Sequence, residues 1–306
     1  MNIGGIVIPI VTPLQDEGKL DRVGTCRLAE YLLASGIDGI FVAGTTGEYP
    51  RLTDKMRWDS FEAVAQAVAG RALVYAGISA AGLEATQMHA RVAAESGADF
   101  LVASLPYYFP ITDTVEATTY FLEIADTCEK PLMLYNIPGN VGSVIPLSAV
   151  RKLATHHRIV GIKDSGSDLE YFKELLEINK EHPSFKVFAG NEAMLMKVLP
   201  LGAHGAVPSL ANVFPNLFVE LWHYAQNENW PEVSRICLKI TKINQLNDLC
   251  QGTSLGHIRW KKFALSLLRI CSSQTTKPYI PLTREQGVQV EKILKKYGGE
   301  ELAMDQ

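Results

Sequence analysis

One feature constrains the fold of this chain most: a short apolar run followed by a longer segment with helical spacing, repeated along the first 230 residues. Such runs, bounded by turn-forming residues, are typical of buried strands, and apolar residues three and four apart are typical of helices. The predicted strands are residues 3–12, 39–44, 72–79, 100–105, 131–137, 159–164, 185–190 and 205–209. The predicted helices between them are residues 22–35, 54–69, 83–96, 114–129, 147–156, 169–180 and 192–199. This alternation predicts a parallel sheet covered by helices.

A closed barrel and a doubly wound open sheet both fit strands that alternate with helices. The doubly wound sheet normally binds a nucleotide through a glycine-rich turn after its first strand. Here that strand is followed by TPLQDEG, and neither G-x-G-x-x-G nor G-x-x-x-x-G-K-[ST] occurs in the chain. Several predicted helices stop at a glycine just before the next strand, as capped helices do: Gly36, Gly70, Gly97 and Gly202. We therefore predict a (β/α)8 TIM barrel.

The pattern changes beyond Trp230, where only helical segments are predicted, at residues 232–249, 255–271 and 284–296. We interpret residues 230–306 as a C-terminal helical region packed on a barrel of residues 1–229. The chain has 306 residues, of which 47% are hydrophobic, which is ample for one large core.

Charge and cysteine usage exclude several classes of protein. The net charge of −4 gives no basic footprint for nucleic acid or a membrane surface. No apolar run reaches membrane-spanning length, and the N-terminal MNIGGIVIPIVTP lacks the basic region and cleavage site of a signal peptide. The five cysteines are scattered and odd in number, which is typical of reduced core thiols. We expect a cytoplasmic protein with no nucleic-acid or membrane partner.

The chemistry of a TIM barrel lies where its strands end, at their C-terminal side. Alternate residues of a strand share a face, so Ile159, Gly161 and Lys163 are predicted to point one way. By the same parity Tyr135 ends the neighbouring strand on the matching face. Gly161 would leave room for the Lys163 amine inside the barrel, where lost solvation of the charged form favours the free, nucleophilic amine. A lysine that caps a strand end in solvent is the alternative.

Hydroxyl groups follow two other strands. Thr45 and Thr46 stand in GTTGE (residues 44–48), a turn whose consecutive backbone N–H groups suit a carboxylate. An ordinary turn whose threonines cap the next helix is the alternative. Tyr107 and Tyr108 lie between two prolines after the fourth strand, where surface packing is the simpler interpretation.

No metal or cofactor site is predicted. The seven histidines fall in helices or connections, and none stands at a strand end beside the carboxylate cluster that a metal-dependent aldolase or hydrolase needs. No serine, histidine and aspartate arrangement is legible either. The strand ends offer an amine, phenols and threonine hydroxyls, which are groups for covalent chemistry on a carbonyl compound.

Four motifs together resemble the dihydrodipicolinate synthase / N-acetylneuraminate lyase family: GTTGE at residues 44–48, PYY at 106–108, YNIP at 135–138 and GIKD at 161–164. The resemblance spans nearly the whole chain and implies Schiff-base chemistry on pyruvate without a cofactor. Lys163 matches the Schiff-base lysine and Tyr135 the tyrosine that shuttles protons. Thr45 and Thr46 match the residues that hold the pyruvyl carboxylate, with Thr45 also in the proton relay.

The resemblance also implies roles at the rim of the site. Tyr108 matches the tyrosine that the synthase branch offers across a dimer interface, so a homodimer or homotetramer is expected. Val207 stands where the family places a backbone carbonyl near the lysine. Ser209 ends the eighth strand at the same mouth, where we expect it, with Gly190 and Glu192 after the seventh strand, to contact the second substrate.

The second substrate divides the family into branches. In the synthase branch an arginine stands two residues after the proline of YNIP and grips the aldehyde's carboxylate, but this chain has Asn140, and an amide cannot replace a bidentate cation. In the sialic-acid branch Gly-x-Asp-Glu binds sugar hydroxyls, whereas residues 190–193 are GNEA. The favoured hypothesis is therefore an aldolase that joins pyruvate to the aldehyde of a 2-keto-3-deoxy sugar acid, or cleaves that bond.

Other readings remain open. Within the family they are 4-hydroxy-tetrahydrodipicolinate synthase, N-acetylneuraminate lyase and a keto-deoxy sugar acid dehydratase that uses the same Schiff base. A catalytically silent keto-acid-binding member is the alternative outside enzymes. The intact lysine, tyrosine and threonines argue against silence.

Overall fold

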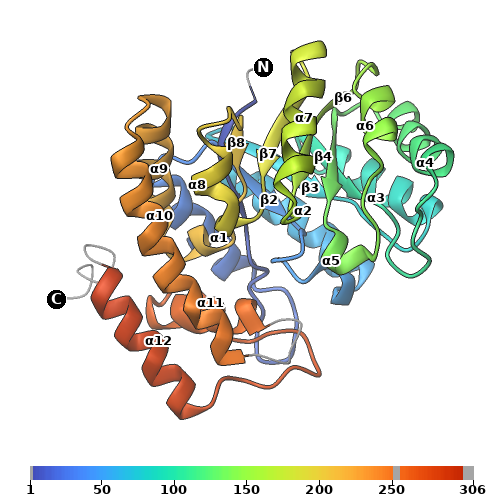
Figure 1. Cartoon of the computed structure of the whole chain (residues 1–306). Helices are drawn as coiled ribbons and strands as arrows, with labels where there is room; N and C mark the ends of the chain where they lie inside the picture. Colours follow the sequence, from blue (N-terminus) through green and yellow to red (C-terminus); the bar gives the residue numbers. More distant parts are fainter. Residues whose placement is uncertain (1–2, 251–255, 299–306) are drawn as a thin grey trace.

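The computed structural model describes residues 3–250 and 256–298 and contains a closed barrel of eight parallel strands in sequential order, which confirms the predicted fold (Figure 1). The strands are β1 Gly5–Pro9, β2 Gly39–Val42, β3 Leu73–Gly77, β4 Phe100–Ser104, β5 Leu132–Asn136, β6 Ile159–Asp164, β7 Lys186–Ala189 and β8 Gly205–Ala206. Most are shorter than predicted, because the apolar run continues into the buried loop after the strand. The extreme case is β8, where two residues replace the five expected.

The helices surround the barrel and follow the predicted order (Figure 1). They are α1 Arg22–Leu33, α2 Asp54–Val68, α3 Leu83–Glu95, α4 Thr114–Thr127, α5 Pro138–Val141, α6 Leu147–Leu153, α7 Leu169–Glu181 and α8 Leu195–Val198. Short 3-10 turns are η1 Tyr49–Arg51, η2 Glu192–Met194, η3 Leu210–Asn212 and η4 Gln245–Cys250. The helix predicted at residues 192–199 is therefore η2 followed by α8, and the short α5 was not predicted.

Side chains inside the barrel form a core separate from the one beneath the helices. The inner core contains Ile3, Val7, Phe41, Tyr75, Phe100, Val102, Met133, Tyr135, Phe188 and Val207. The Tyr75 and Phe100 rings stack with centroids 4.8 Å apart. The larger outer core joins the helices to the other face of the strands. The barrel interior is thus packed by aromatic and branched side chains, as in other barrels of this size.

The parity predicted for the start of β6 is wrong. The register between β5 and β6 shifts at Leu132/Met133, so that Leu132 pairs with Ile159 and Met133 with Gly161. This irregularity turns Ile159 to the outer core and Val160 to the inner core, the reverse of the prediction. The ladder is regular from Gly161 onward, so the parity of the functional end of the strand holds.

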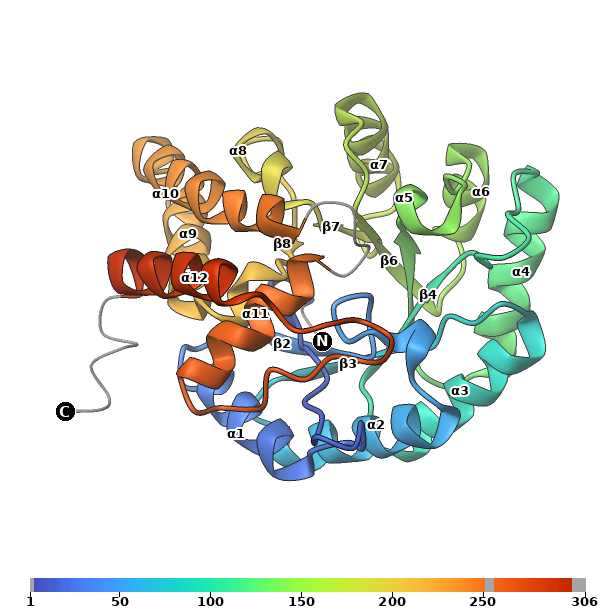
Figure 2. The ribbon, with the colours of Figure 1, turned by 90° about the horizontal axis from the view of Figure 1, so that it is seen from below.

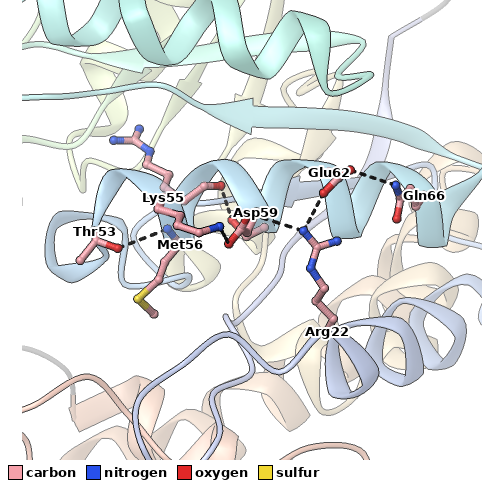
Figure 3. A network of polar contacts seen from close by, with 9 residues as sticks. Arg22, Thr53, Lys55, Met56, Asp59, Glu62 and Gln66 are labelled. Carbon is pink, nitrogen blue, oxygen red and sulfur yellow. Dashed lines mark hydrogen bonds and ion pairs between the residues drawn. The ribbon is translucent and has the colours of Figure 1, made fainter.

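The first two helices pack side by side under a network of exposed ion pairs (Figure 3). Arg22 of α1 reaches Glu62 of α2 at 2.6 Å and Asp59 at 3.5 Å. Thr53 caps α2 by accepting a hydrogen bond from the backbone N–H of Met56. Such exposed pairs contribute at most about 1 kcal/mol each, so the buried faces of the helices supply most of the packing energy.

The C-terminal part of the chain is helical, as predicted, with α9 Pro215–Gln226, α10 Trp230–Asn244, α11 Gly256–Leu267 and α12 Arg284–Tyr297. The α10 helix packs on α8 and α9, and α11 packs on η3 and α12. Figure 2 shows the connection from α11 to α12 passing over one end of the barrel. The division at residue 230 stays a prediction, but this region is in contact with the barrel.

The described cysteines are free, but they differ in burial. Cys128, Cys237 and Cys271 are free and buried, as predicted, whereas Cys26 is free but exposed on α1. The side chain of Cys250 lies outside the described residues. Within the described ranges, no helix is long and apolar enough to cross a membrane.

The barrel closes between its shortest and its first strand, and one side chain completes this seam. Only Gly5 and Ile6 of β1 pair with Gly205 and Ala206 of β8. Beyond them Asn212, fully buried, accepts from the N–H of Val11 at 2.9 Å and donates to the carbonyls of Pro9 and Ser209 at 2.8 and 2.9 Å. The Asn212 amide therefore takes the place of ladder hydrogen bonds that the two-residue β8 cannot make.

We expect Asn212→Leu to lower the free energy of unfolding by about 2–4 kcal/mol, because it leaves the Val11 N–H and the Pro9 carbonyl buried without partners. Denaturant unfolding measures this loss. The exposed side chain of Asn227 makes local contacts with one residue, the carbonyl and the ring Nε2 of His223, so Asn227→Leu should change stability by less than about 0.5 kcal/mol. Equal effects of the two substitutions would contradict the role of Asn212.

Candidate active site

The amine and the phenol singled out in the sequence lie side by side at the ends of two neighbouring strands. Tyr135 and Lys163 are direct partners in the register of β5 and β6. The Lys163 Nζ lies 4.1 Å from the centroid of the Tyr135 ring and 5.0 Å from that of Phe41. Lys163 is only 4% exposed. The predicted inward position is confirmed, and the alternative of a solvent-exposed lysine is wrong.

Two glycines make this position possible, but not in the way the sequence predicted. A Cβ atom on Gly161 would lie 2.3 Å from the carbonyl oxygen of Lys186, so this glycine permits close approach of β7. Room for the lysine comes from Gly190, where a Cβ atom would lie 2.7 Å from Lys163 Cε and 2.1 Å from Ser165 Oγ. Gly190, expected to contact the second substrate, is therefore a neighbour of the amine itself.

The turn after β2 brings a hydroxyl to the phenol. Thr45 Oγ1 and Tyr135 Oη are 3.3 Å apart, and Thr46 beside them is buried. The N–H groups of Gly47 and Glu48 donate within the turn, to the carbonyls of Gly44 and Thr45, so the predicted row of free N–H groups is shorter than expected. Within the part of the chain that the structure describes, no hydrogen bond engages the N–H groups of Thr45 and Thr46. The capping alternative is wrong for both threonines, since Thr53 caps α2.

A second pair of side chains at the same strand ends, Asn136 and Asp164, points away from the lumen and was not predicted. Asn136 Nδ2 donates to Asp164 Oδ1 at 2.7 Å, and Asn136 Oδ1 accepts from the N–H of Ile145 at 3.1 Å. The N–H of Gly166 also donates to Asp164. Burial raises the pKa of the Asp164 carboxyl. This pair fixes the two strand ends that carry Tyr135 and Lys163. In the sequence each member directly follows one of these residues, as YN and KD, and this spacing could have indicated a second pair on the opposite face of the strands.

The two tyrosines after β4 lie in different environments. Tyr107 is half-buried, with its ring edge-on to that of Tyr49. Tyr108 is 75% exposed and contacts Phe109, which is 79% exposed. Among the described residues of one chain, no hydrogen bond joins Tyr108 to Thr45 or Tyr135. The structure therefore leaves Tyr108 outside the site that Lys163, Tyr135 and Thr45 form.

Glu192 and Ser209 come together at the mouth of the barrel, as the sequence predicted, but they bind each other. Glu192 Oε1 accepts from Ser209 Oγ at 3.1 Å and from the N–H of Leu210 at 2.7 Å. Its other oxygen accepts from Asn244 Nδ2 of α10 at 2.7 Å. The carboxylate is thus already hydrogen-bonded, which makes it a support for the mouth. Asn140 lies on α5 and is exposed.

The lumen around the amine is apolar. A cavity beneath Lys163 is lined by Val7, Phe41, Tyr75, Val102, Met133, Phe188 and Val207. Val207 is buried there, and its N–H donates to the carbonyl of Ala189. Larger cavities of about 430 and 600 Å³ open at the opposite end of the barrel, near Ile3 and Lys186. The space beneath Lys163 is only about 10 Å³ and is a gap in the packed inner core. Barrel enzymes place their chemistry at the C-terminal ends of strands, which is the end of the barrel where Lys163, Tyr135 and Thr45 meet.

In the described ranges, no group of three or more histidine, cysteine, aspartate and glutamate side chains lies close enough together to hold an ion. A buried amine on an aromatic lumen, with a phenol and a threonine hydroxyl beside it, instead defines an enzyme of the class I aldolase type.

The chain belongs to the dihydrodipicolinate synthetase family, whose model matches residues 2–297. It is 39% identical over 216 residues to 4-hydroxy-tetrahydrodipicolinate synthase 1 of Streptomyces coelicolor, covering 70% of this chain and 69% of that one. It is 32% identical over 222 residues to an uncharacterized DapA-like lyase of Halobacterium salinarum, covering 72% of each. Members of the family are pyruvate-dependent lyases, and this chain is one of them.

Solved structures of members of the same family have the same fold as this chain. Dihydrodipicolinate synthase from Bacteroides thetaiotaomicron superposes with a TM-score of 0.92 and 33% identity, covering 97% of this chain and 100% of that one. YagE, a prophage protein of the same family from Escherichia coli, was solved in complex with pyruvate. It superposes with a TM-score of 0.90 and 26% identity, covering 97% of this chain and 99% of that one.

We expect Gly190→Ala to lower kcat/KM at least about 100-fold, because the new methyl group displaces the Lys163 side chain, and a misplacement near 1 Å has this effect. Steady-state kinetics measures it. Gly82→Ala is the control, since its Cβ atom would meet nothing within 4 Å. Full activity of Gly190→Ala would show that the lysine tolerates displacement.

Proposed function

We propose that this protein is a Schiff-base aldolase that forms or cleaves the bond between pyruvate and the aldehyde of a 2-keto-3-deoxy sugar acid. The observation that carries the proposal is the contact of the Lys163 amine with Tyr135, whose phenol lies 3.3 Å from Thr45. The family assignment supports the pyruvate half of the reaction, and Asn140 supports the choice of aldehyde.

The chemistry follows from these neighbours. The Lys163 amine attacks the ketone carbon of the keto acid, and the oxygen takes up two protons in turn, one that the nitrogen loses and one that Tyr135 delivers. Loss of that oxygen as water gives an iminium ion, which accepts the electrons of the breaking carbon–carbon bond and becomes an enamine. The aldehyde leaves as its hydroxyl loses a proton. The enamine then takes up a proton at carbon, and water hydrolyses the resulting iminium ion to pyruvate and the free Lys163 amine. Tyr135 stands where the ketone oxygen gains a proton and the aldehyde hydroxyl loses one, and the Thr45 hydroxyl passes protons onward from the phenol.

The pyruvyl carboxylate is assigned to the turn after β2. Thr45 and Thr46 follow β2 at the same end of the barrel as Lys163, and a carboxylate bound there would accept hydrogen bonds from their hydroxyls and N–H groups. The backbone carbonyl of Val207 is assigned to the other side of the amine, on the evidence of its place in the lumen cavity.

The aldehyde half-site is proposed to accept hydroxyl groups. Asn140 both donates and accepts hydrogen bonds, which matches a polyhydroxylated chain. A second carboxylate would need a cation, and this position carries none. The name of the Streptomyces coelicolor relative favours the synthase as the rival function, and the dehydratase and the N-acetylneuraminate lyase share the same pyruvate half-site.

Assembly is part of the proposal. We assign Tyr108 and its exposed neighbour Phe109 to an interface between two copies of the chain, where Tyr108 reaches the partner's proton relay. Two aromatic rings, each more than 70% exposed, support this assignment. A homodimer or a tetramer of two dimers in the cytoplasm is the proposed form.

Treatment with borohydride in the presence of pyruvate should reduce a Schiff base and leave a stable pyruvyl adduct on Lys163. Peptide mass spectrometry locates the adduct. The variant Lys163→Ala should show none, while Lys186→Ala, at the other end of the barrel, should be labelled like the wild type. Labelling at another lysine, or absence of labelling in the wild type, would overturn the proposal.

The aldehyde preference is tested at Asn140. Because a hydrogen bond to a charged group contributes about 1.5–3 kcal/mol, its absence should reduce kcat/KM for aspartate semialdehyde roughly 10- to 150-fold. Condensation of pyruvate with polyhydroxylated aldehydes should therefore be faster, and Asn140→Arg should narrow the gap. Product analysis identifies a dehydratase by a single dehydrated keto acid. A wild type that prefers aspartate semialdehyde would be a synthase.

A further inference from the structure

A buried ion pair joins the GTTGE turn to the C-terminal helical region. The side chains of Glu48 and of Lys262 on α11 are both 0% exposed, and Glu48 Oε1 lies 2.6 Å from Lys262 Nζ. Glu48 Oε2 accepts from the N–H and from the hydroxyl of Thr276, each at 2.8 Å. Lys262 Nζ also donates to the carbonyl of Gln274 at 2.7 Å. Both carboxylate oxygens are therefore held by residues 262–276.

The backbone of Glu48 is bound just as firmly to the turn. Its φ of 61° is left-handed, a conformation that costs a non-glycine residue energy and persists where surrounding contacts enforce it. The Glu48 N–H donates to the carbonyl of Thr45 at 3.0 Å. The carbonyl of Gly47 accepts from the Thr12 hydroxyl at 2.7 Å. The turn is thus held from the loop after β1 on one side and from the C-terminal region on the other.

A short chain of contacts leads from this ion pair to the reacting amine. Glu48 bonds to Thr45, the Thr45 hydroxyl lies 3.3 Å from the Tyr135 phenol, and the Tyr135 ring lies against Lys163. Glu48 and Lys262 have no solvent exposure, so neither side chain is available to a substrate. Any effect of the pair on the reaction passes through the position of the turn.

We infer that Glu48 and Lys262 are positioning residues, which set the left-handed turn so that Thr45 and Thr46 meet the substrate carboxylate. The inference rests on the proposed function of those threonines. A buried ion pair is weak evidence for stability, because desolvation offsets most of the attraction. The pair instead fixes the position of the turn, because Lys262 and Thr276 join Glu48 to the C-terminal helical region.

The experiment compares pyruvate affinity with stability. For each variant the pyruvate concentration that gives half-maximal borohydride-trapped adduct on Lys163 is measured, together with the urea unfolding midpoint. Glu48→Gln keeps an acceptor for Thr276 but loses the charged contact, and it should raise the half-maximal concentration about tenfold. The double variant Glu48→Gln with Lys262→Met removes the charge left unpaired. It should recover stability while the half-maximal concentration stays raised.

A matched control separates position from stability. Leu294 of α12 is buried in the outer core of the same helical region, so Leu294→Ala should lower the unfolding midpoint without moving the half-maximal concentration. The inference is wrong if that control raises it as much as Glu48→Gln does, or if the double variant recovers affinity along with stability. A wild type that forms no adduct would refute the proposed function itself. A labelled wild type with an unchanged Glu48→Gln variant would refute only the positioning role.

Discussion

The parallel register of β5 with β6 is the constraint on which the site depends. It sets Tyr135 opposite Lys163 and, one residue on, Asn136 opposite Asp164. Because successive side chains of a strand alternate between faces, the first pair enters the lumen and the second faces the helices. One pair carries the proposed chemistry while the other joins the strand ends by a hydrogen bond of 2.7 Å. A slip by one residue would exchange the two faces and destroy both functions.

The interior of the barrel surrounds the Lys163 amine with apolar groups. Lys163 is packed against the rings of Phe41 and Tyr135, and the lumen below it holds apolar side chains. Its amine has aromatic rings, and no carboxylate, as its described close neighbours. The hydroxyl groups proposed to exchange protons stand toward the mouth, where Thr45 meets the Tyr135 phenol. The apolar inner core therefore lies on one side of the Lys163 amine, and the hydroxyl groups of Thr45 and Tyr135 lie on the side of the barrel mouth.

Much of this arrangement was predictable from the sequence because it is local or periodic. The eight apolar runs, the helices between them, and the shared face of Tyr135 and Lys163 all follow from spacing along single elements. The errors have a different origin. The irregularity at Val160, the role of Gly161, and the bonds of Glu192 to Ser209 and Asn244 depend on which strands and helices meet in space. A single sequence carries no signal for such distant contacts.

Two hydrogen bonds between distant parts of the chain, Asn212 to Val11 and Thr276 to Glu48, also affect how the chain folds during synthesis. Asn212 bonds to the Val11 N–H across 201 residues of sequence, and Thr276 bonds to Glu48 across 228. Contacts of such separation close large loops and form slowly. During synthesis, which proceeds from the N-terminus, Glu48 has to wait for Thr276 to leave the ribosome before its carboxylate is satisfied. A nascent chain that holds the whole barrel but not yet residues 262–276 would therefore carry a charged, unfinished turn, and the Glu48 carboxylate gains its partners only after those residues emerge.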